Sequence, residues 1–179
     1  MKYSKYAMNV DSILLDAHSL KILFELQRDA RQTVQQISEA VGLSPTPCWK
    51  RIKDMEAAGV IRGYTAVIDR EKVGLHVAAV AEANLDRHSE SQVQRFEDAV
   101  AASPQIINCV SATGPADYIL TVLVQDMKHY ERFLHETLFS LPGVTHVRSS
   151  IVLRQVKSEV ALPIEQVGQP GSAPRGPRG

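Results

Sequence analysis

The segment from Gly42 to Tyr64, GLSPTPCWKRIKDMEAAGVIRGY, limits the possible folds more than any other part of the sequence. Ser44 is a residue type that favours the N-cap of a helix. Pro45 follows at the first helical position, where a missing N–H costs nothing. The pattern therefore predicts a helix from Pro45 to about Ala58.

The two sides of this predicted helix differ in chemistry. At about 100° per residue, Cys48, Ile52 and Met55 form one apolar stripe, which we expect to be buried. The other side is basic, and its candidate DNA-contacting residues with their flanks are Ser44, Thr46, Pro47, Trp49, Lys50, Arg51 and Lys53. Lys and Arg bind guanine edges and phosphates, so this face suits a major groove. An ordinary solvated helix face would have a similar pattern.

A first helix is predicted near the start of the chain. Asp16 is suited to cap it, and it extends to about Arg28. Leu20, Leu23 and Phe24 recur at helical spacing and are expected to form its apolar face.

A second, shorter helix lies between these two. Thr33 and Gln36 have the spacing of a capping box, and Gly42 can adopt the positive φ that ends the helix. A helix, a tight turn and a second helix make a helix-turn-helix, which favours DNA binding by the basic face. We expect this DNA-binding domain over residues 11–63.

The sequence period changes after the third helix. Residues 60–68, VIRGYTAVI, are rich in β-branched and aromatic side chains and predict a strand. A strand at this position would be a wing or part of a connector, which we place at residues 64–75.

Residues 76–164 indicate a second domain. Alternating small residues from Val77 predict a strand, followed by a helix, two strands around Gly114 and Pro115, a second helix and a last strand from Val144. The order βαββαβ predicts an α+β, ferredoxin-like fold. The alanines of the first strand would let a second sheet pack closely, so we expect a homodimer.

Composition excludes several classes of protein. Acidic and basic residues balance at 20 each, so DNA binding has to use a local patch. No apolar run is long enough to cross a membrane and no signal peptide is present, which predicts a cytoplasmic protein. Cys48 and Cys109 are too few for a disulfide framework or a thiolate metal site. No catalytic, metal or cofactor motif is present, so no enzyme activity, metal or cofactor is expected.

The two ends of the chain lack the features of packed structure. Residues 1–10 have no periodicity, and residues 165–179 are rich in Gly and Pro. Both segments are expected to be disordered.

Four runs together resemble the Lrp/AsnC (feast/famine) transcriptional regulators. They are LDAHSLKILFELQRDAR, GLSPTPCWKRIKDMEAAGVIRGYTAVID, TGPADYILTVLV and ETLFSLPGV, in the family's order and spacing, and they are most similar to its leucine-responsive branch. The resemblance implies a winged helix-turn-helix, a β-strand connector, and a C-terminal effector and assembly domain. It also implies amino-acid ligands, and dimers that assemble further into octamers.

One loop is the main candidate for binding a small molecule. Its Gly-x-x-Asp-Tyr pattern resembles the family's effector loop, which implies effector contacts from Thr113, Gly114, Asp117 and Tyr118. The same residues would also suit a plain hairpin turn. Pro115 and Ala116 depart from the acidic or aromatic residues that the family often has there.

These observations predict a sequence-specific transcriptional regulator that binds double-stranded DNA and senses an amino acid. Two alternatives remain open at this stage. One is an architectural protein that wraps DNA with low specificity. The other is an amino-acid-binding regulatory subunit of an enzyme, against which the basic helix face argues.

Overall fold

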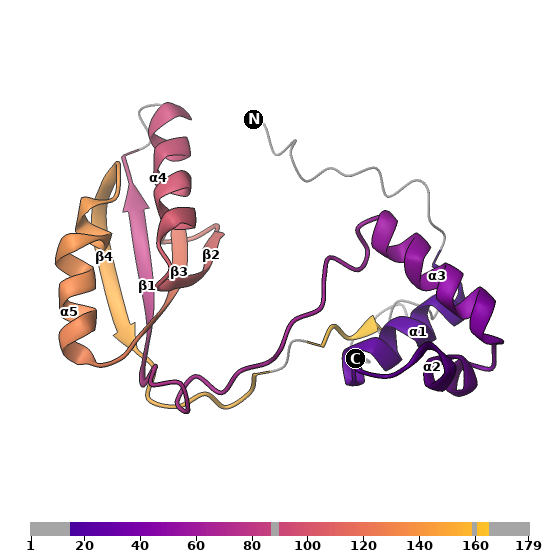
Figure 1. The fold of residues 1–179 in the computed structure, drawn as a ribbon. Coiled ribbons are helices and arrows are strands. Elements are labelled where there is room, and N and C mark those ends of the chain that lie inside the picture. Colours follow the sequence, from indigo (N-terminus) through magenta and orange to yellow (C-terminus); the bar gives the residue numbers. More distant parts are fainter. Residues whose placement is uncertain (1–14, 87–89, 159–160, 165–179) are drawn as a thin grey trace, which may run out of the picture. The chain divides into compact units, whose positions relative to one another are not determined.

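The computed structural model describes residues 15–86, 90–158 and 161–164 (Figure 1). The segments expected to be disordered, residues 1–10 and 165–179, lie outside these ranges. The chain divides into two compact units. Unit 1 comprises the described residues up to Ala66 together with those from Ser158, and unit 2 comprises Val67–Lys157.

Unit 1 has three helices in its described part: α1 (Ala17–Arg28), α2 (Val34–Val41) and α3 (Pro45–Ala57). These limits confirm the three predicted helices. The Asp16 carboxylate accepts a hydrogen bond from the Ser19 backbone N–H at 2.8 Å, which caps α1.

The capping box of α2 is formed as predicted. The Gln36 backbone N–H donates to the Thr33 hydroxyl at 3.2 Å, and the Thr33 backbone N–H donates to the Gln36 side chain at 2.8 Å. Two donors at the start of the helix are thereby satisfied.

Glycine in the left-handed conformation ends both α2 and α3. At the end of α2, Gly42 has φ 72°, and the next N–H, of Leu43, donates to the Ser38 carbonyl at 2.9 Å. Gly59 has the same φ after α3. Because few other residues adopt this conformation cheaply, these glycines turn the chain sharply after each helix.

The core of unit 1 consists of buried side chains from all three helices: Ile22, Ile37, Val41, Cys48, Ile52 and Met55. The expected stripe of α3 is confirmed, but the expected face of α1 is partly wrong. Ile22 is fully buried, whereas Phe24 is 41% exposed. Apolar residues lie on several sides of α1, so helical spacing alone selects more than one face.

The described part of unit 2 contains a four-stranded sheet and two α-helices. In chain order the elements are β1 (Val77–Leu85), α4 (Glu90–Ala102), β2 (Ile106–Ser111), β3 (Tyr118–Val124), α5 (Met127–Glu136), a 3₁₀ turn (Leu138–Ser140) and β4 (Val144–Ile151). The strand order is β2-β3-β1-β4, and all neighbouring strands are antiparallel. The predicted βαββαβ order is confirmed.

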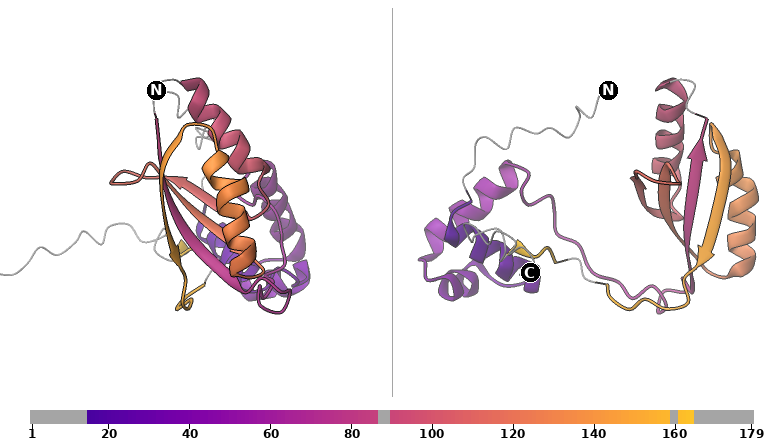
Figure 2. Two further views of the ribbon diagram at one scale, coloured as in Figure 1. Left: turned by 90° about the vertical axis from the view of Figure 1, so that its left-hand side faces the viewer. Right: turned by 180° about the vertical axis from the view of Figure 1, so that it is seen from behind.

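The helices α4 and α5 cover one face of this sheet (Figure 2). Ala79, Ala81 and Ala83 are fully buried on that face, packed with Phe96 of α4 and Phe133 of α5. The expectation that these alanines admit a second sheet is therefore wrong, because helices of the same chain already cover them. Their small side chains instead allow the helices to approach β1 closely.

The strand expected over residues 60–68 is absent. Residues 61–69 have no helix or strand assignment, and Val67 and Ile68 are 83% and 66% exposed. A strand needs a neighbour for its backbone N–H and C=O groups, and no described segment pairs with this one.

No described helix is long and apolar enough to span a membrane.

Candidate DNA-binding and effector-binding sites

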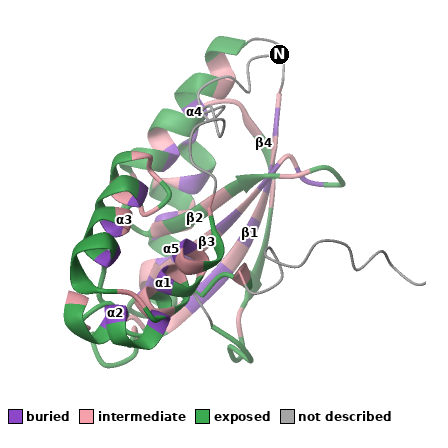
Figure 3. Ribbon diagram, turned by 90° about the vertical axis from the view of Figure 1, so that its right-hand side faces the viewer, coloured by how far each residue is buried: buried purple, intermediate pink, exposed green. Residues whose placement is uncertain are grey.

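The outer side of α3 is solvent-exposed (Figure 3). Thr46, Pro47, Lys50 and Lys53 are exposed, and Trp49 is 52% exposed although it is a large apolar residue. A fixed helix with an uncrowded outer side is the geometry that major-groove recognition requires. These predicted residues therefore do share one accessible side.

The basic residues of α3 differ in their ionic partners. The half-buried Arg51 pairs with Asp16 at 2.9 Å, and Lys53 pairs with Glu56 at 2.6 Å. Lys50 has no ion pair within the described part of the chain. Of these three cations, Lys50 is thus the one that forms no ion pair with a described carboxylate.

The N-terminus of α3 is a weaker anion site than its capping residue suggests. Ser44 lies at the N-cap, but its side chain makes no capping hydrogen bond. Pro45 and Pro47 lack N–H groups, which leaves Thr46 as the one donor among the first three helical positions.

The predicted effector residues lie at the β2–β3 hairpin but differ strongly in exposure. Thr113 and Gly114 are exposed, Asp117 is half-buried, and Tyr118 is only 7% exposed. Backbone hydrogen bonds hold the hairpin, with the Ala112 N–H donating to the Asp117 carbonyl at 3.0 Å. The loop therefore presents its first half to solvent and its second half to the protein interior.

The side chain of Asp117 supports the sheet. Its carboxylate accepts a hydrogen bond from the Leu85 backbone N–H at 3.0 Å, beside a register shift of the β1–β4 pair at Asn84 and Leu85. The Asn84 amide donates to the Pro115 carbonyl at 3.0 Å, so the end of β1 is joined to the loop at two points.

Tyr118 belongs to the core of unit 2. Its hydroxyl donates to the Glu97 carboxylate at 2.9 Å, and its ring centroid lies 4.6 Å from that of Phe96. Both contacts tie β3 to α4. Within a single chain, this side chain thus has a structural role.

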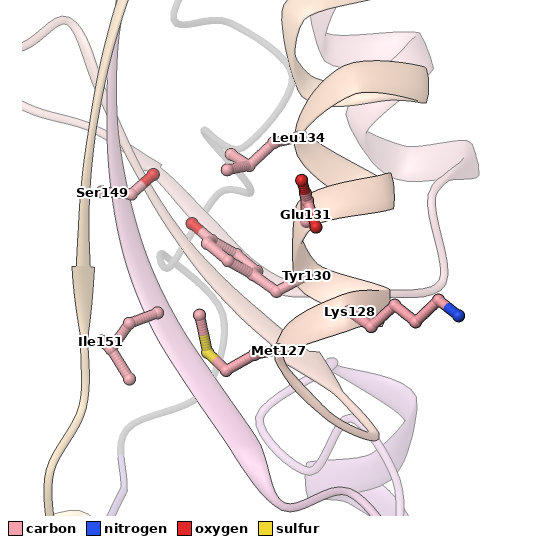
Figure 4. Close-up of a pocket in the computed structure, with 7 residues that line it drawn as sticks. All are labelled: Met127, Lys128, Tyr130, Glu131, Leu134, Ser149 and Ile151. Carbon is pink, nitrogen blue, oxygen red and sulfur yellow. The ribbon is translucent and has the colours of Figure 1, made fainter.

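A separate hollow of about 480 Å³ lies between α5 and β4 (Figure 4). Its lining is mainly apolar and includes none of the predicted effector residues: Met127, Lys128, Tyr130, Glu131, Leu134, Ser149 and Ile151. The Tyr130 hydroxyl is shielded from solvent and has no hydrogen-bond partner in the described part of the chain. The charged end of Lys128 points away from the hollow.

Sequence reasoning missed two polar contacts of unit 1. Glu56 accepts hydrogen bonds from both Lys53 and Tyr64. The Gln27 side chain pairs with the backbone of Leu162, accepting from its N–H at 2.6 Å and donating to its carbonyl at 3.2 Å. The i, i+3 spacing of Lys53 and Glu56 is a signal for the first contact. No signal for the second exists, since 135 residues separate its partners.

Among the described residues no group of three or more His, Cys, Asp and Glu side chains could hold a metal ion. Cys48 and Cys109 are both free. Burial is the main cause that raises the pKa of each thiol, so both are held in the neutral form.

Two family models match the chain, one for each unit. A model described as winged helix-turn-helix DNA-binding matches residues 15–62. A model described as Lrp/AsnC ligand binding domain matches residues 78–162.

Characterised relatives match nearly end to end. The DNA-binding transcriptional activator DecR of Escherichia coli is 38% identical over 152 residues, which cover 85% of this chain and 100% of that protein. The leucine-responsive regulatory protein of Haemophilus influenzae is 39% identical over 143 residues, covering 80% of this chain and 86% of that protein. A Neisseria meningitidis transcriptional regulator, solved in complex with L-Met, has a TM-score of 0.81 and 35% identity, and the match covers 86% and 99% of the two chains.

A helix-turn-helix with an exposed basic face, joined to a separate ligand-binding α+β domain, defines a DNA-binding transcriptional regulator. The chain belongs to the Lrp/AsnC family of such regulators. The resemblance seen in the sequence is thereby confirmed.

Proposed function

We propose that this regulator places α3 in the major groove, and that its DNA contacts come from Ser44, Thr46, Pro47, Trp49, Lys50, Arg51 and Lys53. The exposed, unpaired Lys50 carries the proposal, because its charge is offset by no carboxylate in the described residues. Arg51, which is paired with Asp16, acts mainly by holding α3 against the start of α1. We propose that the protein acts on DNA in the cytoplasm. We also propose that it is not an enzyme.

Salt dependence tests this assignment. Each phosphate neutralised by a lysine releases counterions, so Lys50→Ala should reduce the slope of log K against log salt by about one per subunit. The probe is the DNA upstream of the protein's own gene, measured beside a random duplex of equal length. Lys128→Ala is the matched control, since Lys128 is also exposed but lies in unit 2. Equal slopes for Lys50→Ala and the wild type would refute the contact.

We infer that the effector is an amino acid. This inference rests on the ligand-binding domain match and on the related regulator solved with L-Met. We assign its contacts to the hairpin residues Thr113, Gly114, Asp117 and Tyr118. Because the latter two side chains also support the sheet, we propose that a second copy of the chain completes the site.

The open face of the sheet is the surface that we propose for dimerisation. Val80, Ile119 and Leu123 point away from the helix-covered core, and Val110 on β2 is 45% exposed beside them. These apolar residues share the face with Glu82, which lies opposite Ile119, and Thr121, which lies opposite Val80. We propose that burial of the apolar residues against the same face of a second copy gives an isologous dimer. Assembly of dimers into octamers remains a prediction from the family resemblance.

Light scattering on the full chain tests the dimer face. Ile119→Glu places a charge in the centre of the face and should shift the protein toward monomer. Leu153→Glu is the control, because Leu153 is 97% exposed and lies beyond the end of β4. Dimers of undiminished stability in Ile119→Glu would show that another surface is used.

The mechanism that we propose is thermodynamic linkage. An effector that binds one dimer or higher assembly more tightly than the others shifts the population toward that assembly. The α3 helices then take the spacing found in that assembly, which changes the affinity of the protein for paired half-sites. Gel shifts on the upstream fragment with L-methionine, L-leucine or no amino acid measure this coupling directly. An affinity that no amino acid changes would leave DNA binding intact but refute amino-acid sensing.

A further inference from the structure

The first residues after α3 fold back onto the helix. The N–H groups of Val60 and Ile61 both donate to the Met55 carbonyl, at 2.9 and 3.1 Å, and the Ile61 side chain packs against the core of unit 1. Gly59, with φ 72°, makes this reversal possible. The chain therefore turns back along the last turn of α3 before the linker begins.

Tyr64 then attaches the chain to α3 once more. Its hydroxyl donates to one carboxylate oxygen of Glu56 at 3.0 Å, and the Lys53 ammonium donates to the other oxygen at 2.6 Å. One carboxylate thus joins a candidate DNA-contacting lysine to the chain that leaves the domain. The next four residues, Thr65 to Ile68, are exposed and make no hydrogen bond with another described residue, so Tyr64 is the last attached residue before this free segment.

The charge states of Glu56 and Tyr64 support this arrangement. Hydrogen bonds from Lys53 and then from Tyr64 lower the pKa of Glu56, which keeps it ionised. Burial, followed by the hydrogen bond to Glu56, raises the pKa of Tyr64, so its hydroxyl keeps the proton that it donates. Both interactions are therefore present at neutral pH.

We propose that Glu56 is a positioning residue of the DNA interface, which fastens the start of the linker to the recognition helix through Tyr64 and, by pairing with Lys53, reduces the charge that this lysine brings to its proposed DNA contact. The hydrogen bond between Tyr64 and Glu56, which we call the anchor, determines where the unattached part of the linker begins. Without it, the residues 62–64 would join the linker and lengthen its reach by roughly 10 Å per subunit. An anchored linker consequently restricts the half-site spacings that a dimer can span.

The second consequence concerns electrostatics. The Lys53–Glu56 pair has no net charge, so bringing it to DNA neutralises little phosphate charge and releases few counterions. Lys50, which has no such partner among the described residues, differs from Lys53 in this respect. The two lysines of the same helix face are therefore unequal in their contribution to salt dependence.

Limited trypsin digestion of the full chain tests the anchor without DNA. Cleavage after Arg62 requires the segment around it to leave α3, so Tyr64→Phe should accelerate this cut about two- to tenfold, the range expected for loss of one hydrogen bond. Cleavage after Lys72 is the internal control, because Lys72 is exposed and lies beyond the free segment. Glu56→Ala should accelerate the Arg62 cut equally, and the double variant no further.

Glu56→Gln distinguishes an anchor from a general effect of residue 56. The Gln side chain keeps an acceptor for the Tyr64 hydroxyl, so it should restore slow cleavage after Arg62, while the ion pair with Lys53 is lost. Unchanged cleavage after Arg62 in both Tyr64→Phe and Glu56→Ala would overturn the anchor. Faster cleavage in Tyr64→Phe than in Glu56→Ala would mean that Tyr64 has another partner, which also overturns it.

Salt dependence tests the second part, which rests on the proposed DNA contact. With the upstream fragment as the probe, Lys53→Ala should lower the slope by much less than one per subunit in the wild-type background, but by about one in the Glu56→Gln background. If Lys53→Ala lowers the slope equally in both backgrounds, the proposal that Glu56 reduces the charge that Lys53 brings to DNA is overturned. If Lys50→Ala also leaves the slope unchanged, the DNA face itself is wrongly assigned, so the two failures are distinguishable.

Discussion

Asp117 offers a sharp test because two roles meet in one side chain. As an effector contact it would bind the ligand's ammonium group, and as a sheet residue it accepts the Leu85 N–H at 3.0 Å. The substitutions Asp117→Ala and Asp117→Asn separate these roles. Ala removes both functions, whereas Asn keeps a neutral oxygen at the same place and much of the turn-forming capacity.

The loss of stability that we expect for Asp117→Ala follows from the Leu85 backbone N–H, which would lose its acceptor. Leu85 is only 8% exposed, so its N–H has little access to water once the carboxylate is gone. A donor left unsatisfied in this way costs about 1 to 3 kcal/mol. For a domain of the size of unit 2, this corresponds to a fall in Tm of roughly 5 to 20 °C. Asp117→Asn should cost well under half of that.

Calorimetric melting of the full chain measures these values, and Asp98→Ala is the control. Asp98 lies on α4 and is exposed, with a hydrogen bond only to the Gln94 side chain among the described contacts, so its loss should change stability by no more than about 0.5 kcal/mol. A Tm for Asp117→Ala equal to that of Asp98→Ala would refute the structural role. If Asp117→Asn melts normally but binds L-methionine or another effector tenfold or more weakly, the carboxylate is also an effector contact.

Three further changes test other parts of the fold. Tyr130→Phe removes a buried hydroxyl that has no partner among the described residues and should stabilise unit 2 by about 1 kcal/mol in urea denaturation; a loss of stability would contradict this. Gly42→Ala should destabilise unit 1 by about 1 to 2 kcal/mol, because open space surrounds the residue and the positive φ alone opposes a side chain, and Gly42→Asn should cost less. The hydrogen bond from the Ser19 N–H is the main cause that lowers the pKa of Asp16, so its stabilisation is complete above the unfolded value of 3.8 and is lost as the pH falls through the lower folded value. Asp16→Asn should remove that part of the acid-induced decline, whereas identical pH profiles would contradict it.

Features that depend on neighbouring residues were predicted well from the sequence. The cap at Asp16, the capping box at Thr33 and the helix end at Gly42 all involve partners within five residues. The buried stripe of α3 could also be predicted from the sequence, because side chains on a helix recur with a fixed period. Short-range rules were therefore enough to predict the helix-turn-helix.

Features that depend on distant partners were predicted poorly. The segment from Val60 to Ile68 has the composition of a strand but no described segment to pair with. The alanines of β1 were assigned to an open face because their small size says nothing about which side the helices cover. The period-2 pattern identifies two faces of a strand, but the choice between them depends on packing from elsewhere in the chain.

The candidate sites show the same limit. Spacing on α3 identified the exposed cations, but not that Glu56 and Asp16 would pair with two of them. The family pattern identified Asp117 and Tyr118, but not that both side chains also support the sheet, through Leu85 and Glu97 respectively. Sequence motifs thus locate a site, whereas competition among its side chains becomes visible only in three dimensions.

The way the chain connects its two units bears on how a ligand could affect DNA binding. The backbone passes between the units twice, after Ala66 and before Ser158. On the side of unit 1, the first crossing begins after Tyr64, whose hydroxyl donates to Glu56 of α3, and the second ends at Leu162, which pairs with Gln27 of α1. The two crossings are thus attached to unit 1 by contacts with different helices, α3 and α1, and Tyr64→Phe removes the first contact while leaving the second.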